Sequence, residues 1–284
     1  MHKPNIVVLG YSGLIGRQLI PQLIAAGFTG QVVSRSRREL PGAFEWIDSL
    51  NFIDGTFSIP VESVVLSLCK LPLTAEFSSK FAQANQLIAL SSTSVFTKQS
   101  SSDPGELRLS QRLQTAEELI QATSEDLPYT ILRPTIIYDA ETDVSINQIA
   151  KIIRRYGFFA VAGRGSGLRQ PIHAADVAAM MVQCIERDAV KNVALNISGG
   201  EPLSYRKMVE RIAVGIGTKP RIVSVPVWLL KGLVSVMRIL TLTKHSPNMI
   251  DRMNNDMAFD NSKAVALLEI QPRKFHPDFT HSEQ

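Results

Sequence analysis

The sequence predicts an α/β protein: a doubly wound parallel Rossmann sheet with a smaller C-terminal substrate-binding cap. Two observations support this prediction. Short apolar runs alternate with helical segments through the first half of the chain, which is typical of parallel strands covered by helices on both faces. The first run, 5–9, leads directly into three glycines spaced three residues apart and then into an apolar-periodic helix. We therefore expect the first half to be a dinucleotide-binding domain.

The glycine turn consists of Gly10, Gly13 and Gly16. Gly10 allows the sharp turn off the strand, Gly13 lets the backbone approach a pyrophosphate, and Gly16 lets helix and sheet pack closely. The phosphates then lie at the positive N-terminus of the helix, which Gly27 stops at its other end. The helix has one apolar face, made of Leu14, Ile15, Leu19, Leu23 and Ile24.

The remaining elements follow in order. Five further strands are expected in the first half, at 31–34, 44–47, 64–68, 87–90 and 129–132, with helices at 76–85 and 110–123. Beyond residue 139, helices at 146–156, 174–187 and 205–215 and a strand at 193–197 accompany a glycine-rich loop at 163–167. We expect residues 1–140 to form the dinucleotide-binding domain, with about 170–200 returning to its sheet. Residues 141–284 are expected to form a discontinuous cap over the carboxyl edge.

The composition of the chain limits the classes of protein to which it can belong. The chain has 284 residues, 45% of them hydrophobic, which is enough for a large core. Its net charge of +4 is mild, and its basic residues are scattered except for the run at 35–38, so no nucleic-acid partner is expected. The first strand begins too early to leave room for a signal peptide. Cys69 and Cys184 lie in apolar segments at no metal spacing, which favours reduced thiols, no metal and a cytoplasmic protein.

The longest apolar stretch, 225–242, is opened by Pro226 and interrupted by Lys231 and Arg238. It is too short and too charged for a membrane span. We expect a helix packed on the second domain, and the alternative is an amphipathic anchor lying on a membrane surface.

Five segments, in order along nearly the whole chain, resemble the extended short-chain dehydrogenase/reductase superfamily, in particular its nucleotide-sugar epimerases and dehydratases. They are the Gly10 turn, 90–96, 132–138, 170–178 and 259–264. The resemblance implies an NAD(P)-binding oxidoreductase or isomerase with a small-molecule substrate, a nucleotide sugar. It also implies cofactor contacts from Ser12, Leu14, Ile15, Leu68, Cys69, Pro134 and Thr135.

Ser92 falls where this family has the serine or threonine that binds the reacting hydroxyl or carbonyl. A hydroxyl at the carboxyl end of a central strand faces the cofactor crevice. We expect Ser92 to polarise the reacting oxygen, with Thr93, Ser94 or a water relaying the proton. The alternative is that Ser92 bonds only to local backbone.

The family's catalytic tyrosine and lysine are missing. Their positions fall at Leu109 and Leu113, or at Ser110 and Gln114 if the register shifts by one, and no tyrosine occurs between positions 11 and 129. Leu109, Leu113, Ala116 and Ile120 are expected to form an apolar stripe instead. Arg112, Gln111 or Gln114 is a candidate for holding the nicotinamide ribose, but none is a good general base, because a guanidinium stays protonated and an amide does not titrate.

The end of the second strand indicates the cofactor. NAD-selective relatives have an acidic side chain there, whereas this chain has Ser34, Arg35, Ser36, Arg37 and Arg38. Arginines and serines bind a 2′-phosphate that a carboxylate would repel, so Ser34 and Arg35 favour NADP over NAD. The alternative is an ordinary solvated loop. Asp48, after the third strand, is expected to reach the adenine amine.

In the cap, Arg169 matches the position at which relatives clamp a nucleotide diphosphate, and Asn147, Arg164 and Arg252 are expected companions. The alternative is that each is a surface residue. His173 and Asp176 are expected to be structural rather than catalytic.

Two functions follow from these observations. The first is an NADP-dependent nucleotide-sugar reductase, epimerase or dehydratase that works without the Tyr-Lys pair. The second is a catalytically weak NADP(H)-binding module acting as a redox sensor or assembly subunit. Both a monomer and a homodimer stay open.

Overall fold

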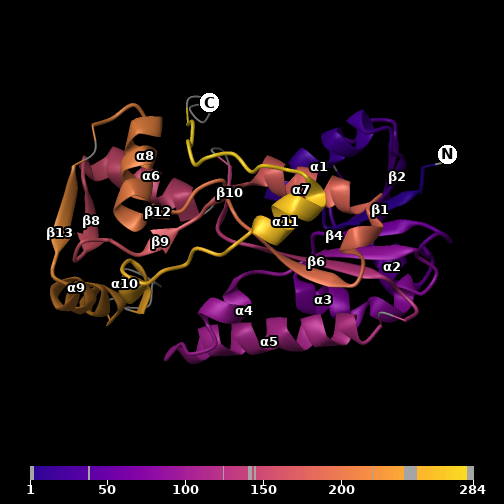
Figure 1. The fold of residues 1–284 in the computed structure, drawn as a ribbon, viewed down its shortest axis with the longest axis horizontal. Coiled ribbons are helices and arrows are strands. Elements are labelled where there is room, and N and C mark those ends of the chain that lie inside the picture. The colour runs from indigo at the N-terminus through magenta and orange to yellow at the C-terminus, as the bar shows by residue number, and fades with distance from the viewer. Residues whose placement is uncertain are drawn as a thin grey trace.

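A seven-stranded parallel sheet forms the centre of the larger body of the molecule, on the right in Figure 1. The computed structural model describes residues 3–37, 39–123, 125–139, 143, 145–219, 221–239 and 248–279, so Arg38 lies outside the described residues. The strand order is β11-β6-β5-β4-β1-β2-β3, with every neighbouring pair parallel, which confirms the predicted fold class. The strands are β1 Ile6–Leu9, β2 Gly30–Ser34, β3 Phe44–Asp48, β4 Val64–Ser67, β5 Gln86–Leu90, β6 Tyr129–Pro134 and β11 Val193–Ile197.

Helices cover both faces of this sheet (Figure 1). Because side chains alternate along a strand, Ile6 and Val8 enter one core and Val7 and Leu9 enter the other. The first face is covered by α1 Leu14–Ala25, α7 Ala174–Cys184 and α11 Ser262–Leu268. The second is covered by α2 Ser49–Asp54, α3 Leu71–Glu76, η1 Ser78–Phe81, α4 Ser94–Thr97 and α5 Pro104–Gln121.

Three helices differ from the prediction. The helix expected at 76–85 is instead α3 followed by the single turn η1, because Pro72 starts a helix five residues earlier. Helix α5 begins at Pro104 rather than at residue 110, because the Asp103 carboxylate accepts hydrogen bonds from the Gly105 and Glu106 amides. Helix α7 ends at Cys184, three residues before the predicted end.

A second, smaller body lies beyond one end of the sheet (Figure 1). It has two cores of its own, one around Ile149, Met208 and Phe275 and the other around Leu230 and Met253. We call it the cap, and we propose that it is a separate substrate-binding part of the chain. Its elements are α6 Ser145–Tyr156, β8 Phe159–Ala162, β9 Leu168–Arg169, β12 Leu203–Ser204, α8 Tyr205–Gly215, β13 Ile222–Val225, α9 Val227–Ile239 and α10 Asn248–Arg252. β7 Ile137–Tyr138, β10 Ile172–His173 and η2 Asp188–Val190 complete the described elements.

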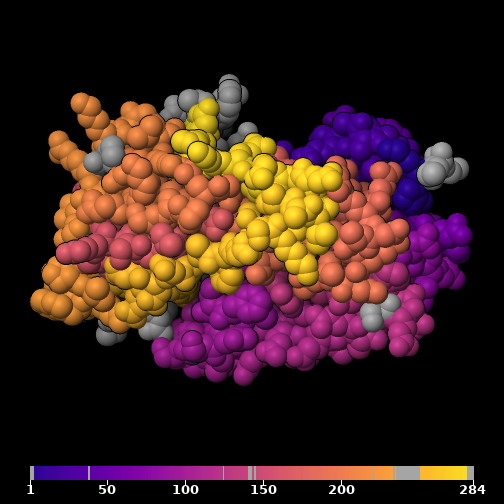
Figure 2. Space-filling model, in the orientation of Figure 1, coloured from indigo at the N-terminus to yellow at the C-terminus, as the bar shows by residue number. Residues whose placement is uncertain are grey.

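The C-terminal segment ties the two bodies together. It crosses from α10 to α11 on the sheet and then returns toward the cap (Figure 2, yellow). On the outward crossing, the Ser198 hydroxyl donates to the Phe259 carbonyl at 3.0 Å. On the return, Phe275 and Phe279 are buried in the cap core. This double crossing fixes the cap over the carboxyl edge of the sheet.

The apolar stretch 225–242 forms α9, as far as the structure describes it. Leu230 packs against Ile250 and Met253 in the cap, as expected for a helix packed on the second body. Trp228 and Leu229 of the same helix are exposed. No helix in the described part of the chain is long and apolar enough to cross a membrane.

Candidate active site at the carboxyl edge of the sheet

The glycine turn follows β1, at the point where the direction of chain progression across the sheet reverses. Gly10 has a φ of +80°, and a Cβ there would lie 2.9 Å from the Cys69 sulfur. A Cβ at Gly16 would lie 1.8 Å from the Tyr11 carbonyl oxygen. Gly13 is different: it is exposed, its φ is −85°, and no protein atom lies within 4 Å of its Cβ position. The fold therefore requires Gly10 and Gly16, whereas Gly13 leaves open space in front of the N-terminus of α1.

The other expected cofactor contacts surround this turn. Leu68 follows β4, and its amide donates to the Leu9 carbonyl at 2.9 Å. Burial raises the pKa of the Cys69 thiol, which keeps it protonated. Ser12 and Leu14 are half-buried at the start of α1, and Ile15 belongs to the core.

Pro134 and Thr135 end β6 close to Ser92 and Thr93. The Pro134 carbonyl accepts the Thr93 amide at 3.1 Å. The Thr135 hydroxyl donates to the Gln170 carbonyl, so this side chain links the sheet to the chain entering α7.

The end of β2 presents two exposed arginines among the described residues, Arg35 and Arg37, and the Arg37 guanidinium lies 5.9 Å from the Trp46 ring centroid. The Ser34 hydroxyl donates to the Ser36 carbonyl at 2.9 Å and accepts from the Trp46 indole at 3.0 Å, so its hydrogen bonds are used within the protein. Arg35 is exposed beside it. The Asp48 carboxylate accepts from the Leu50 amide at 2.9 Å and caps α2. Of these three expected contacts, Arg35 is the one whose polar group is not engaged locally.

A cavity of about 580 Å³ lies between the carboxyl end of β5 and the cap. Its described lining holds hydroxyls on the sheet side, three cations and otherwise mainly apolar side chains, and it includes no carboxylate. The cations are Lys98, Arg169 and Arg252. The sheet-side hydroxyls are Ser92, Thr93, Ser94, Thr97 and Thr135, and the apolar walls include Ile136, Ile149, Ile152, Phe159, Met208, Met253 and Met257. Such a lining suits an anionic ligand with an apolar portion.

Ser92 bonds to local backbone and also lies at the cavity. Its Oγ accepts the Ser94 amide at 3.1 Å, and the residue also lines the cavity. Because the oxygen accepts this amide, the hydroxyl proton stays available to a ligand. Thr93 also lines the cavity, but its hydroxyl donates to the Pro134 carbonyl at 3.2 Å. Ser92 is therefore the better placed of the two as a donor.

Neither register of the missing tyrosine and lysine supplies a titrating group. Leu109 is 41% exposed, so it does not belong to the expected apolar stripe. Ser110 takes its place among the buried residues of α5, and its hydroxyl donates to the Val95 carbonyl at 2.7 Å. Leu113 is buried in the core, Gln114 donates to Glu118 on the surface, and Arg112 is exposed and lines no described part of the cavity.

Sequence reasoning missed Lys98. It follows α4, six residues after Ser92, and lines the same cavity. Burial and the nearby Arg252 guanidinium lower the pKa of its ammonium, while Asp103 opposes this shift. Within the described part of the chain, its ammonium forms no ion pair with a carboxylate. Its closeness to Ser92 in the sequence could have indicated it. It was not predicted because the lysine of the resembled family lies after the tyrosine position, and Lys98 lies before it.

Arg169 is 3% exposed and reaches the cavity from β9. Its guanidinium donates to the Asn255 carbonyl at 2.9 Å and to the carbonyls of Leu168 and Arg252, and it lies 5.3 Å from the Tyr205 ring centroid. These partners are neutral, and the guanidinium forms no ion pair with a described carboxylate, although burial lowers its pKa and the charge of nearby Asp256 opposes this shift. Burial raises the pKa of Tyr205 to about 12, which keeps this phenol neutral.

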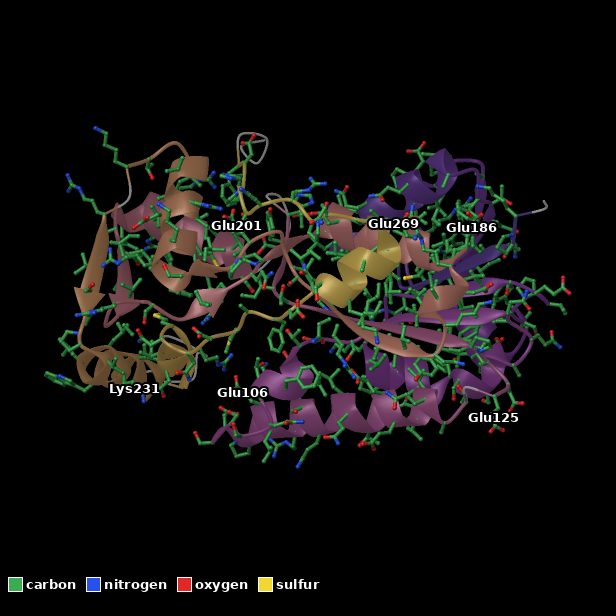
Figure 3. All side chains as sticks on the ribbon, in the orientation of Figure 1. Glu106, Glu125, Glu186, Glu201, Lys231 and Glu269 are labelled. Carbon is green, nitrogen blue, oxygen red and sulfur yellow. The ribbon has the colours of Figure 1, made fainter. Side chains whose placement is uncertain are left out.

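The structure brings one of the three expected companions to Arg169. Arg252 lines the cavity and forms an ion pair with Glu106, which Figure 3 labels at the end of α5 near the cap. Asn147 lies outside the described lining, with its amide donating to Asp143 at 3.3 Å. Arg164 is exposed and is likewise not among the lining residues.

His173 and Asp176 have structural positions. The His173 Nδ1 accepts the Ala175 amide at 3.1 Å and caps α7. The Asp176 carboxylate accepts from the Arg273 amide and Nε, both at 2.9 Å. In the described residues, no three His, Cys, Asp or Glu side chains form a group that could hold a metal ion.

Solved structures with the same architecture share this arrangement of sheet and cap. MoeE5 in complex with UDP-glucose and NAD is 21% identical, with a TM-score of 0.68 over 95% of this chain and 94% of that one. A UDP-N-acetylglucosamine 4-epimerase from Bacillus cereus is 17% identical, with a TM-score of 0.68 over 99% and 94%. Epimerase Mth375 from Methanothermobacter thermautotrophicus is 14% identical, with a TM-score of 0.71 over 99% and 91%.

No protein-family model matches the sequence, and a search of curated proteins finds no match. The structural similarity establishes the fold. The chain has the extended short-chain dehydrogenase/reductase fold, in the form that nucleotide-sugar epimerases and dehydratases have.

Proposed function

We propose that this protein is an NADP-dependent oxidoreductase or epimerase acting on a nucleotide sugar or a similar phosphorylated substrate, without the usual tyrosine and lysine. The observation that supports this most is the convergence of two features at one sheet edge. The Gly13 turn leaves open space at the N-terminus of α1, and Ser92, Lys98 and Arg169 line one cavity beside the cap.

The residues present fit a nicotinamide dinucleotide. Gly10, Gly13 and the amides at the start of α1 would hold the pyrophosphate, and Leu68 and Cys69 border the same crevice. When bound, the dinucleotide would supply or accept a hydride. The structural neighbours described with a cofactor contain NAD. Our preference for NADP rests on Arg35 and on the absence of an acidic residue in the described end of β2.

Two side chains have the chemistry needed at the substrate oxygen. Ser92 would donate its hydroxyl hydrogen bond to a carbonyl oxygen and polarise it. The Lys98 ammonium would transfer a proton to that oxygen as it becomes a hydroxyl, and the resulting amine would regain a proton from solvent. In the reverse direction the amine would accept the hydroxyl proton. Its lowered pKa suits this exchange, because a general acid works best with a pKa near the working pH.

Arg169 supports a phosphorylated substrate. A buried guanidinium that forms no ion pair in the described structure, with Asp256 acting on it only from a distance, would be stabilised by a bound anion, and its fork matches phosphate oxygens. The structural neighbours in complex with UDP-glucose and UDP-glucuronic acid have substrates of this kind. The apolar wall around Met253 would contact the less polar portion of the ligand.

The second candidate function is a catalytically weak NADP(H)-binding module. It is favoured by α5, which places Ser110, Leu113 and no titrating group where relatives have their tyrosine and lysine.

Turnover with a panel of nucleotide sugars separates the two functions. The purified protein is incubated with NADPH or NADP⁺ and UDP-glucose, UDP-glucuronic acid or UDP-N-acetylglucosamine, and products are resolved by chromatography. We expect Ser92→Ala and Lys98→Met each to reduce kcat by about 10²–10⁴-fold, with NADPH affinity unchanged. Lys274→Met, at an exposed lysine, is the matched control. If the wild type binds NADPH but neither binds nor converts any sugar, the binding module is the better account.

Cofactor choice has its own test. Arg35→Asp should weaken NADPH binding and make NADH the tighter ligand, because a carboxylate repels the 2′-phosphate and accepts the ribose hydroxyls. Fluorescence titration of both cofactors measures this preference. Equal affinity of the wild type for NADPH and NADH would contradict the assignment of NADP.

A further inference from the structure

The cap has an unusual charge balance. Segments 145–169 and 203–231 together contain eleven lysines and arginines and one carboxylate, Glu210, although the whole chain has a net charge of only +4. The remainder of the chain is therefore net acidic. The eleven cations are Lys151, Arg154, Arg155, Arg164, Arg169, Arg206, Lys207, Arg211, Lys219, Arg221 and Lys231.

Four of these cations are accounted for within the protein. Arg169 lines the cavity, Arg211 pairs with Glu201, Lys207 pairs with Glu210, and Lys231 pairs with Asp251. The other seven are solvent-accessible, and none forms an ion pair with a described carboxylate. The cap therefore presents seven cationic side chains to solvent.

Besides Val214 on α8, five large apolar side chains are exposed in the described part of the same body. They are Tyr156 at 59%, Phe158 at 45%, Val223 at 47%, Trp228 at 74% and Leu229 at 49% exposure. Apolar side chains exposed singly are ordinary, but several gathered in one place mark an interaction surface.

The folded chain places these apolar and basic groups along one edge of the cap, from the start of the β8–β13 pair to the beginning of α9. β8 and β13 pair in parallel, with the Phe159 amide donating to the Arg221 carbonyl, so Phe158 and Arg221 adjoin at the start of both strands. The Arg206 guanidinium donates to Ser224 of β13 at 2.7 Å. Helix α9 begins two residues after β13 and carries Trp228.

We call this surface the cap tip: Tyr156, Phe158, Val223, Trp228 and Leu229, with Arg155, Arg206, Lys219 and Arg221. β13 and the start of α9 lie at the end of the molecule farthest from the sheet (Figure 1), and Figure 3 shows Lys231 of α9 at that end. The same end is the orange extremity of the space-filling view in Figure 2.

We propose that the cap tip binds the surface of an anionic lipid bilayer. Tryptophan, tyrosine and phenylalanine side chains partition into the headgroup region of a bilayer, and lysines and arginines around them are attracted to anionic lipids. Because no described helix is long enough to cross the bilayer, this attachment is peripheral. Nucleic acid fits less well, since the aliphatic Val223 and Leu229 have no role against a phosphate backbone. The surface goes beyond the proposed enzymatic function, because none of its side chains lines the described cavity.

Vesicle binding tests the proposal. The chain contains two tryptophans, Trp46 and Trp228, so a Trp46→Phe protein reports on Trp228 alone. We expect its emission to shift to shorter wavelength with phosphatidylcholine vesicles containing phosphatidylglycerol, and not with pure phosphatidylcholine. In co-sedimentation of the wild type with the anionic vesicles, Lys219→Glu with Arg221→Glu should reduce partitioning by roughly fivefold per lost cation or more. Phe158→Ser should also reduce it.

The controls lie on the opposite part of the molecule. Leu50→Ser, at a leucine 64% exposed on α2, and Arg17→Glu, at an exposed arginine on α1, should leave partitioning unchanged. Circular dichroism of each variant confirms that it folds, and NADPH binding should not change. Absence of wild-type binding to anionic vesicles would overturn the proposal, as would binding that the cap-tip variants do not alter. A single-stranded RNA that competes with the vesicles for these residues, or a dimer that requires them, would assign the surface to another partner.

Discussion

At the scale of single residues, the three glycines of the turn have different reasons for being glycine. Gly16 is required by the protein itself, because the backbone of Tyr11 occupies the place of its Cβ. Gly13 has no such neighbour in the described structure, so the fold alone does not explain its identity. A ligand phosphate in the open space would explain it.

This difference predicts that the same substitution lowers the stability strongly at one of these glycines and only slightly at the other. Gly16→Ala should lower the free energy of unfolding by about 3 kcal/mol or more, since a backbone contact of 1.8 Å cannot be relieved by a rotamer change. Gly13→Ala, the matched control, should change it by no more than about 1 kcal/mol, as for an ordinary N-cap substitution. Urea unfolding of the ligand-free proteins measures both values. A stable Gly16→Ala protein would show that the turn can rearrange.

The sequence placed Ser92 correctly at the end of a central strand, because strand order and register follow from apolar runs and glycine spacing. It could not place Lys98, which reaches the cavity from the C-terminus of the four-residue helix α4. Nor could it separate Arg169, which is buried, from Arg164, which is exposed five residues earlier. Such differences depend on which side of a short strand faces the cavity.

At the scale of secondary-structure elements, α5 is held to the sheet by a buried ion pair. Glu117 is 4% exposed, and both of its carboxylate oxygens accept hydrogen bonds from the Arg133 guanidinium of β6. It also accepts a hydrogen bond from the hydroxyl of Ser91, which directly follows β5. In this chain the helix therefore contributes packing and this ion pair.

Breaking that pair should be costly, and replacing both partners should not. We expect Glu117→Leu to lower the free energy of unfolding by about 3–5 kcal/mol, because Arg133 is left charged and largely buried. Adding Arg133→Met should recover most of the loss. Glu118→Leu, at the exposed neighbour, should stay within about 0.5 kcal/mol of the wild type. Chemical unfolding of the four proteins gives the result, and equal losses at Glu117 and Glu118 would contradict the structure.

The His173 cap of α7 makes stability depend on pH. Burial and the nearby Arg273 lower the pKa of His173 below its ordinary value of 6.5, and Asp176 and Asp139 oppose this shift. The Nδ1 atom must be unprotonated to accept the Ala175 amide. Because the pKa of His173 is lower in the folded state, the stabilisation of the fold by this cap is fully present above pH 6.5 and is lost as the pH falls through the folded-state pKa. The contribution of the cap is about 0.5–2 kcal/mol.

Melting temperatures of His173→Asn and wild type across this range provide the measurement. Asparagine keeps an N-cap acceptor but does not titrate, so the difference between the two proteins should narrow or reverse as the solution is acidified. A difference that stays constant from neutral to acidic pH would show that His173 remains neutral throughout.

Element boundaries were less predictable than element types. Every strand of the main sheet was expected near its observed position, because continuous apolar runs identify strands buried on both faces. The start of α5 was missed by six residues, since its first turn, from Pro104 to Leu109, shows no apolar periodicity and is fixed by the Asp103 cap.

At the scale of the whole molecule, the sheet and the cap each contribute residues to the proposed active site. The sheet edge carries the glycine turn and Ser92, the cap carries Arg169 and Arg252, and the Arg252–Glu106 ion pair joins the two parts beside the cavity. Scattered basic residues gave no sign in the sequence of the cap tip, because the cap gathers segments that are more than thirty residues apart.

The most direct test of the central claim is a fluorescence titration of the wild type and of Gly13→Val with NADPH. The Cβ of a valine at this position would have no described atom within 4 Å apart from its chain neighbours, and the side chain would occupy the proposed place of the pyrophosphate. We expect the wild type to bind NADPH saturably, and Gly13→Val to fold with little change in melting temperature and to show no binding at concentrations that saturate the wild type. Absence of wild-type binding to either NADPH or NADH, or equal NADPH affinity in both proteins, would contradict a dinucleotide site at this turn.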